Sequence, residues 1–222
     1  MSPLLDAVQI ETAPHPRAAV IWMHGLGADG HDFEPIVPEL DLPEGLPIRF
    51  VFPHAPARPV TINGGAVMRA WYDVFGLGGI RREDAPGVRE SQRSIEALIA
   101  REKERGIAAG RIVLAGFSQG GAMTLQTGLR YPERVAGLLV LSSFLPLADT
   151  VAAEASPANR DVPIFMAHGV HDPMIPVARA QDARDFLTGL GYAVEWHEYA
   201  IPHSVSAEEI ADVSDWFRRV LS

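Results

Sequence analysis

The sequence contains no cysteine among its 222 residues. Without thiols the chain cannot form disulfides, thiolate zinc sites or iron–sulfur clusters, and it cannot use a cysteine nucleophile. It also lacks an excess of basic residues, because its formal net charge is −9. This charge argues against a nucleic-acid partner, since binding to phosphates needs a basic surface.

Long apolar segments are absent as well. The best apolar run, Val135–Leu141, is strand-sized and far shorter than the roughly 18 residues of a membrane span. Met1–Asp6 has neither a basic segment nor a long apolar one, so we expect no signal peptide. These features, with the missing cysteines, lead us to expect a cytoplasmic protein. The length of 222 residues is ordinary for one α/β domain, so we expect residues 1–222 to form a single domain.

Apolar, β-branched runs alternate along the chain with segments of helical periodicity. We expect strands at Ala18–His24, Ile48–Pro53, Arg111–Gly116, Val135–Ser142, Val162–Ala167 and Ala193–Tyr199. We expect helices around Asp32–Glu39, Val88–Arg105, Gln119–Arg130, Val177–Leu190 and Ala207–Leu221. This alternation predicts an α/β fold with a mostly parallel central sheet and helices on both faces. The functional loops of such a sheet follow the carboxyl ends of its strands.

A Gly-x-Ser-x-Gly motif at Gly116–Gly120 joins a predicted strand to a predicted helix. This context is that of a nucleophile elbow, a sharp turn that holds a serine in a strained conformation above the sheet. Glycine is needed on both sides because side chains there would collide with neighbouring elements. We therefore expect Ser118 to be a nucleophile, with the N-terminus of the following helix directed at the site.

A serine hydroxyl needs a base, and this kind of elbow is followed in the chain by Asp or Glu and then by His. His203 lies between the last predicted strand and the last predicted helix, where the base is expected. Asp172 is the carboxylate of the loop after the preceding strand, and we expect it to orient His203. His168 and His171 are expected to make structural hydrogen bonds, because further metal ligands are not evident.

Two backbone N–H groups are expected to form an oxyanion hole. One belongs to the residue after the nucleophile, Gln119, and the other should come from the loop after the first long predicted strand. That loop begins His24-Gly-Leu-Gly27, and its small residues let backbone N–H groups turn into the site. We assign the second donor to Leu26, and we expect His24 to shape the loop.

Two other classes of function are compatible with parts of the sequence. Gly25–Gly30 fits the Gly-x-Gly-x-x-Gly pattern of a dinucleotide site. Such a site also needs an acidic residue at the end of the next strand to bind a ribose, and Phe50–Ala55 contains none. The second alternative is a non-catalytic binding protein of the same fold, which would usually lack one member of the machinery.

The chain resembles the phospholipase/carboxylesterase family of small α/β-hydrolases, which includes bacterial carboxylesterases and the acyl-protein thioesterases. The resemblance runs from about Ala18 to Leu221. The matching stretches are His24–Gly30, Phe52–Pro56, Thr61–Gly65, Trp71–Asp73, Gly116–Gly121 and His168–Asp172.

The resemblance implies an α/β-hydrolase fold without a large cap domain. It implies a triad of Ser118, Asp172 and His203, oxyanion donors at Leu26 and Gln119, and no cofactor or metal. The expected function is that of a serine carboxylesterase that hydrolyses small to medium acyl esters through an acyl-enzyme. Acyl-protein thioesterase and lysophospholipase are the alternatives, because the same triad performs all three reactions.

The insertion at residues 55–86 is expected to flank the active site. The resemblance assigns Trp71 to the substrate pocket, with a core position as the alternative, and we add Met68 and Phe75 to the pocket. One departure from the family is Arg69, which stands where many relatives carry proline. The substrate preference of the relatives therefore does not transfer directly. The apolar side chains of the insertion would also support a homodimer, as in some relatives.

Overall fold

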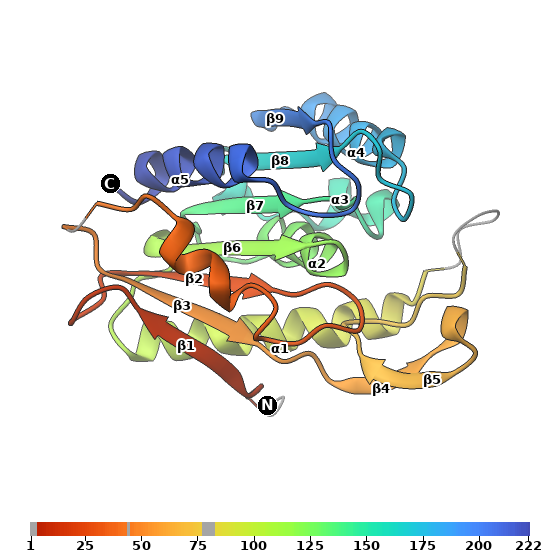
Figure 1. Cartoon of the computed structure of the whole chain (residues 1–222), viewed down its shortest axis with the longest axis horizontal. Helices are drawn as coiled ribbons and strands as arrows, with labels where there is room; N and C mark the ends of the chain where they lie inside the picture. The colour runs from red at the N-terminus through yellow and green to blue at the C-terminus, as the bar shows by residue number, and fades with distance from the viewer. Residues whose placement is uncertain (1–3, 44, 77–82) are drawn as a thin grey trace.

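The computed structural model describes residues 4–43, 45–76 and 83–222. Its central feature is a seven-stranded sheet in the order β1-β3-β2-β6-β7-β8-β9 (Figure 1). The strands are β1 (Ala7–Glu11), β2 (Ala18–Met23), β3 (Ile48–Pro53), β6 (Ile112–Phe117), β7 (Gly137–Leu141), β8 (Ile164–Gly169) and β9 (Val194–Tyr199). The edge strand β1 pairs antiparallel with β3, and every other neighbouring pair is parallel.

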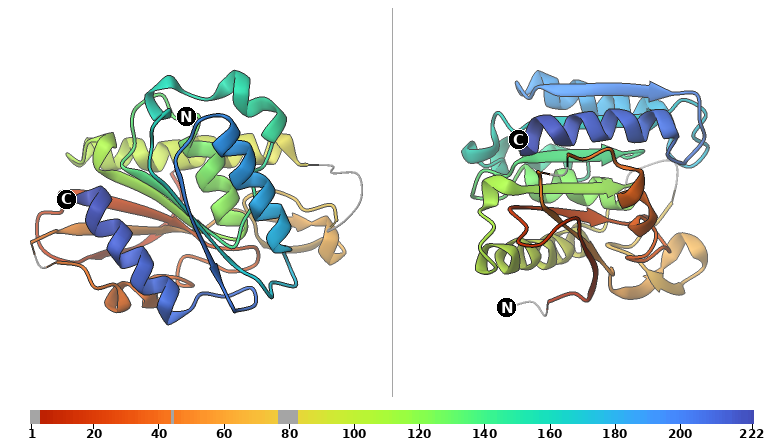
Figure 2. Two further views of the ribbon diagram at one scale, coloured as in Figure 1. Left: turned by 90° about the horizontal axis from the view of Figure 1, so that it is seen from above. Right: turned by 60° about the vertical axis from the view of Figure 1, so that its left-hand side comes forward.

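Helices cover both faces of this sheet (Figure 2). One face carries α1 (Ala85–Glu104), α2 (Gln119–Gly128), α3 (Ala148–Glu154) and α4 (Val177–Gly189). The other face carries α5 (Ala207–Leu221) and the 3-10 helix η1 (Glu34–Glu39). Three further short 3-10 helices are η2 (Thr61–Asn63), η3 (Ala109–Arg111) and η4 (Pro157–Asn159) among the described residues.

The sheet separates two hydrophobic clusters, and β2 contributes side chains to both of them. Ala19, Ile21 and Met23 point into the cluster under the first group of helices. Their neighbours Val20 and Trp22 point into the cluster under α5 and η1. Successive side chains of a strand face opposite sides, so a strand covered on both faces reads as a continuous apolar run.

The six predicted strands and the predicted helices are present in the structure, with boundaries that differ by up to three residues. The segment Asp32–Glu39 forms the short 3-10 helix η1 rather than an α-helix. The elements that were not predicted are the edge strand β1, the helix α3, the short 3-10 helices η2, η3 and η4, and a small antiparallel hairpin. This hairpin consists of β4 (Ala57–Val60) and β5 (Ala66–Arg69) and lies within the predicted insertion 55–86.

Residues 77–82 of that insertion lie outside the described residues. Within the part that is described, no helix is both long and apolar enough to cross a membrane.

Candidate active site

Ser118 lies at the turn between β6 and α2, with a φ of 55° and a ψ of −119°. Such a conformation costs an L-residue on the order of 1–3 kcal/mol. A Cβ atom on Gly116 would lie 2.3 Å from the carbonyl carbon of Gly120, and one on Gly120 would lie 2.1 Å from the Met23 oxygen. The close approach of β6, α2 and β2 therefore imposes both glycines and fixes the position of the serine.

Hydrogen bonds from the neighbouring strand hold this strained turn. The Ser118 N–H donates to the Leu141 carbonyl at the end of β7 (2.9 Å). The Ser118 carbonyl accepts from the Ala122 N–H (3.2 Å) and from the Ser143 hydroxyl (2.6 Å). Sequence reasoning did not identify Ser143. Its position just after β7, at the sheet edge where functional loops are expected, is the signal that could have revealed it.

His203 and Asp172 meet as the sequence predicts. The His203 Nδ1 atom lies 2.5 Å from Asp172 Oδ2. Because a carboxylate only accepts, Nδ1 carries the proton, and Nε2 is left to accept one. The other carboxylate oxygen, Oδ1, accepts from the N–H groups of Met174 and Ile175, each at 2.8 Å. The buried Asp172 is thus held by backbone donors while it orients the imidazole.

His168 supports Asp172 from within the core. Its side chain is fully buried at the end of β8, and its Nε2 atom lies 2.8 Å from the Ile175 carbonyl and 3.3 Å from Asp172 Oδ2. Burial lowers the pKa of His168, so its imidazole is neutral at pH 7. This arrangement agrees with the structural role expected for it.

The loop that begins with His24 packs directly against the elbow. A Cβ on Gly25 would lie 3.4 Å from the Ser118 Cβ. The buried His24 side chain accepts the Ala55 N–H at Nε2 (3.0 Å), and its Nδ1 donates to the Gly25 carbonyl (2.7 Å). Burial lowers the pKa of His24 as well, which keeps this neutral form. His24 thereby shapes the loop that carries Leu26.

A cavity of about 800 Å³ opens beside these residues. Ser118, His203, Leu26 and Gln119 all line it, so the structure brings together the predicted nucleophile, base and oxyanion residues. Asp172 lies behind His203 and does not line the cavity. The volume falls in the range typical of small-molecule sites.

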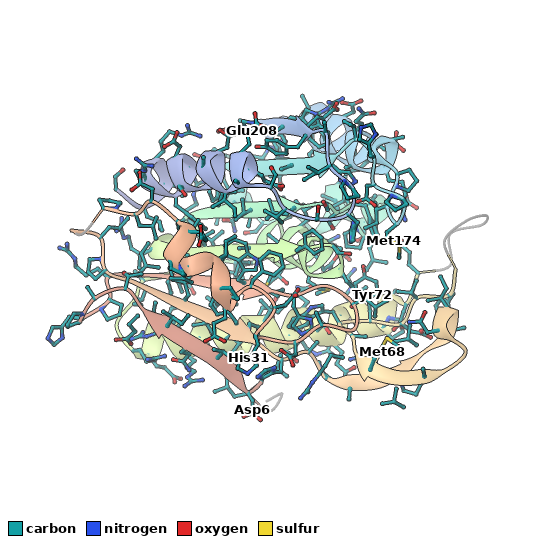
Figure 3. The ribbon with its side chains drawn as sticks, viewed as in Figure 1. Asp6, His31, Met68, Tyr72, Met174 and Glu208 are labelled. Atoms are coloured by element: carbon teal, nitrogen blue, oxygen red, sulfur yellow. The ribbon has the colours of Figure 1, made fainter. Side chains whose placement is uncertain are left out.

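The cavity walls come from the loops after the parallel strands and from the β4–β5 hairpin. Met68 and Phe75 line the cavity, as predicted for the pocket. Ile62, Tyr72 and Val74 also line it, and they belong to the insertion that was expected to flank the site. Sequence reasoning missed Val88, Phe117, Phe144, Pro146, Met174, Ile175 and Arg179. Figure 3 shows the labelled Met68, Tyr72 and Met174 on the same side of the molecule, beyond the ends of the central strands. Most of this lining is apolar.

The assignment of Trp71 to the substrate pocket needs correction. Its side chain is 0% exposed and does not line the cavity, whereas the adjacent Tyr72 does. The Trp71 indole N–H donates to the His24 carbonyl at 2.9 Å. This bond and the surrounding core hold the ring beneath the site, so the core alternative is the correct one.

Three carboxylates that line the cavity, those of Asp73, Glu83 and Asp84, accept hydrogen bonds from neighbouring segments. Asp73 accepts from the Thr61 N–H (2.7 Å) and from its hydroxyl (2.6 Å), and Asp84 accepts from the Asp73 N–H (2.9 Å). The Glu83 carboxylate accepts from the Leu147 N–H at 3.2 Å, which joins the insertion to the start of α3. These acids therefore position the walls of the cavity.

The described ranges contain no group of three or more His, Asp or Glu side chains arranged to hold a metal ion. The chemistry that this site can perform with its own residues is nucleophilic attack by a serine assisted by a histidine base.

Comparisons with known proteins agree with this geometry. A sequence model of the phospholipase/carboxylesterase family matches residues 6–221. Acyl-protein thioesterase 1 of Gibberella zeae is 41% identical over 94% of this chain and 93% of its own length. A probable carboxylesterase of Oryza sativa subsp. japonica is 36% identical over 98% of this chain and 83% of its own length. The crystal structure of Arabidopsis thaliana SOBER1 is 34% identical with a TM-score of 0.87, covering 93% of this chain and 100% of that one.

The chain is therefore an enzyme of the α/β-hydrolase fold that acts on ester or thioester bonds. It belongs to the phospholipase/carboxylesterase family.

Proposed function

We propose that the chain is a serine carboxylesterase that hydrolyses small to medium acyl esters by way of an acyl-enzyme. The observation that carries this proposal is the convergence on one cavity of a serine on a strained elbow and a histidine bonded to a buried carboxylate. Ser118 is the nucleophile, His203 the general base and acid, and Asp172 the residue that orients the imidazole.

In the first step, the Ser118 Oγ attacks the ester carbonyl carbon while its proton passes to His203 Nε2. The carbonyl oxygen becomes an oxyanion that accepts hydrogen bonds from the N–H groups of Leu26 and Gln119. The Asp172 carboxylate stabilises the imidazolium through the bond to Nδ1. The intermediate then collapses, the carbon–oxygen bond to the alcohol breaks, and His203 donates its proton to the leaving alcohol.

In the second step, water attacks the acyl-enzyme. His203 Nε2 takes a proton from the water as its oxygen bonds to the acyl carbon, and the same two N–H groups stabilise the new oxyanion. Collapse releases the carboxylic acid, and the proton returns to the Ser118 oxygen. The cycle needs only the residues of this chain and one water molecule.

The apolar walls of the cavity support a preference for acyl esters. Phe75, Phe144 and Met174 offer surface on which an aliphatic acyl chain is removed from water, at about 0.8 kcal/mol per methylene. The remaining choice is between an oxygen ester and a thioester. Thioester hydrolysis is the second candidate function. Acyl-protein thioesterase 1 of Gibberella zeae, which is 41% identical to this chain, carries that activity in its name.

A matched series of p-nitrophenyl esters and acyl thioesters with chains of two to sixteen carbons separates these functions. The proposal predicts the highest kcat/KM on an oxygen ester of short or medium chain length. A clear optimum on long chains, or a consistent preference for thioesters over the corresponding oxygen esters, would favour the thioesterase or lysophospholipase reaction.

The role of the base is tested by replacing one histidine at a time. His203→Gln should lower kcat on p-nitrophenyl butyrate by at least about a thousandfold, because nothing else in the triad can accept the proton. His197→Gln is the control, since His197 lies in β9 beside Glu195 and does not line the cavity. Equal activity in the two variants would remove His203 from the mechanism.

A further inference from the structure

The segment Arg69–Tyr72 runs between the His24 loop and the start of α2, which carry the two proposed oxyanion donors, and it is hydrogen-bonded to both. It comprises the last residue of β5 and the three residues that follow. Trp71, the largest side chain of this segment, is 0% exposed. The backbone of the segment reaches the His24 loop on one side and the start of α2 on the other.

On the first side, the segment is hydrogen-bonded to residues that lie before and after Leu26. The Trp71 indole N–H donates to the His24 carbonyl (2.9 Å), two residues before Leu26. The Gly27 N–H, one residue after Leu26, donates to the Arg69 carbonyl (2.8 Å). The loop is therefore fixed immediately before and immediately after the residue whose N–H we assign to the oxyanion hole.

On the second side, the segment binds the side chain of Gln119. The Trp71 backbone N–H donates to Gln119 Oε1 (2.7 Å), and Gln119 Nε2 donates to the Tyr72 carbonyl (2.8 Å). Both polar atoms of this buried carboxamide are used in these two bonds. Gln119 thus has two separate roles, since its backbone N–H is the other proposed oxyanion donor.

The segment is itself anchored to the body of the protein. The Ser91 hydroxyl of α1 donates to the Trp71 carbonyl. The Ala70 N–H donates to the Pro56 carbonyl (3.1 Å), and the Arg69 guanidinium donates to the Ala55 carbonyl (2.9 Å). Because Ala55 in turn donates to His24 Nε2, the chain of bonds closes on the loop from which it started.

We propose that Trp71 is a positioning residue that holds the N–H groups of Leu26 and Gln119 at the spacing one oxyanion requires. This inference rests on the proposed function. Trp71 touches neither the cavity nor the reacting atoms, and it acts through the His24 carbonyl and the Gln119 carboxamide. Oxyanion stabilisation depends on donors that are in place before the charge develops, so a small displacement of either N–H weakens it.

The direct test is Trp71→Phe, which deletes the indole N–H and keeps an aromatic ring in the core. The His24 carbonyl then loses its buried donor, and the His24 loop loses one of the two hydrogen bonds that tie it to the segment Arg69–Tyr72. We expect kcat on p-nitrophenyl butyrate to fall about 10- to 100-fold with KM changed less than about threefold, a smaller loss than deletion of a whole oxyanion donor causes.

Trp22→Phe is the matched control. Trp22 is equally buried, in the cluster on the other face of the sheet, and its indole N–H has no hydrogen-bond partner among the described residues. The chemical change is the same in both variants. We expect Trp22→Phe to keep kcat within about twofold, whatever it does to the thermal unfolding midpoint.

A trifluoromethyl ketone that forms an oxyanion on the serine provides a readout that a purely structural role would not change. Its affinity should fall in Trp71→Phe by the same factor as kcat/KM, while binding of an unreactive ether analogue of the substrate stays constant. Gln119→Met keeps the backbone N–H, removes both carboxamide bonds, and should show the same pattern. It decides the question if Trp71→Phe does not fold.

Unchanged kcat and inhibitor affinity in Trp71→Phe, or in Gln119→Met if only that variant folds, would overturn the inference. Equal losses in Trp71→Phe and Trp22→Phe would do so as well. Failure of the proposed function looks different, because it would be seen in the parent protein before any variant is compared: either no turnover of p-nitrophenyl esters, or a preference for long chains or for thioesters.

Discussion

Single residues decide where the reactive groups of this protein lie. Ser118, Asp172 and His203 could be proposed as a triad from the sequence because each is tied to a local signal: two flanking glycines, a loop after a strand, and a loop before the last helix. Trp71 could not be placed in this way. Whether an aromatic residue of an irregular segment faces a pocket or the core depends on contacts with His24 and Gln119, which are distant in sequence.

The glycine at position 120 gives a sharp prediction about stability. Gly120→Ala should destabilise the fold by more than about 3 kcal/mol, because the new methyl group would collide with the backbone of Met23. Gly189→Ala is the matched change in another helix, where the methyl group meets no atom within 4 Å. It should be neutral or stabilise by up to about 1 kcal/mol. Urea unfolding measures both, and similar values would contradict the packing described for the elbow.

Asp172→Asn tests the orienting carboxylate. The amide is close in size to the carboxylate, and its oxygen can still accept the N–H groups of Met174 and Ile175. It cannot stabilise an imidazolium, however, so we expect kcat to fall by about 10³- to 10⁴-fold at pH 8, with little change in KM. Steady-state kinetics on p-nitrophenyl butyrate measure the effect. A loss of less than tenfold would show that His203 does not depend on this partner.

Secondary-structure elements could be predicted where the sequence shows a continuous apolar run, as in a strand that is buried on both faces, or one apolar stripe at helical spacing. The bounds of α5 were predicted in full. Its start is capped by Ser206, whose hydroxyl accepts the Glu209 N–H (3.1 Å). The missed elements depend on tertiary contacts. The hairpin strands β4 and β5 are mostly exposed, and the helix α3 starts after Leu147, whose positive φ is accompanied by a bond to Glu83.

The cap of α5 also gives a prediction about pH. Burial raises the pKa of Glu209 to about 7, opposed by the Ser206 N–H and assisted by the charge of Asp212. The Glu209 carboxyl group therefore binds its proton more tightly in the folded protein than in the unfolded chain. The stability that the protonated form contributes is fully present below about pH 4.5 and is lost as the pH rises towards 7.

Glu209→Gln should remove this loss of stability at higher pH. The amide of the glutamine stays neutral at every pH, and its oxygen can still accept the Ser206 N–H. We expect the variant to be more stable than the parent by about 1–3 kcal/mol at pH 8, with the difference shrinking as the pH is lowered. Glu208→Gln, at the exposed neighbouring position, is the control. A constant difference between pH 5 and pH 8 would contradict the assignment.

At the scale of the whole molecule, the parallel sheet brings loops that are far apart in sequence to one edge. The His24 loop, the elbow at Ser118, and the segments around Phe144, Met174 and His203 all contribute to the same cavity. Sequence alone predicted the parallel sheet and the edge at which the site lies. It did not predict the width of the cavity or the bonds between its walls, because these arise only when the loops assemble.

The proposed mechanism requires that this assembly of loops makes one serine, Ser118, reactive. The most direct measurement is to treat the folded protein with a fluorophosphonate and locate the adduct by mass spectrometry, with Ser118→Ala and heat-unfolded protein as controls. We expect one adduct per chain, on Ser118, that is absent from both controls and forms as esterase activity disappears. A folded, unlabelled protein, or an adduct on another residue with activity retained, would contradict this mechanism.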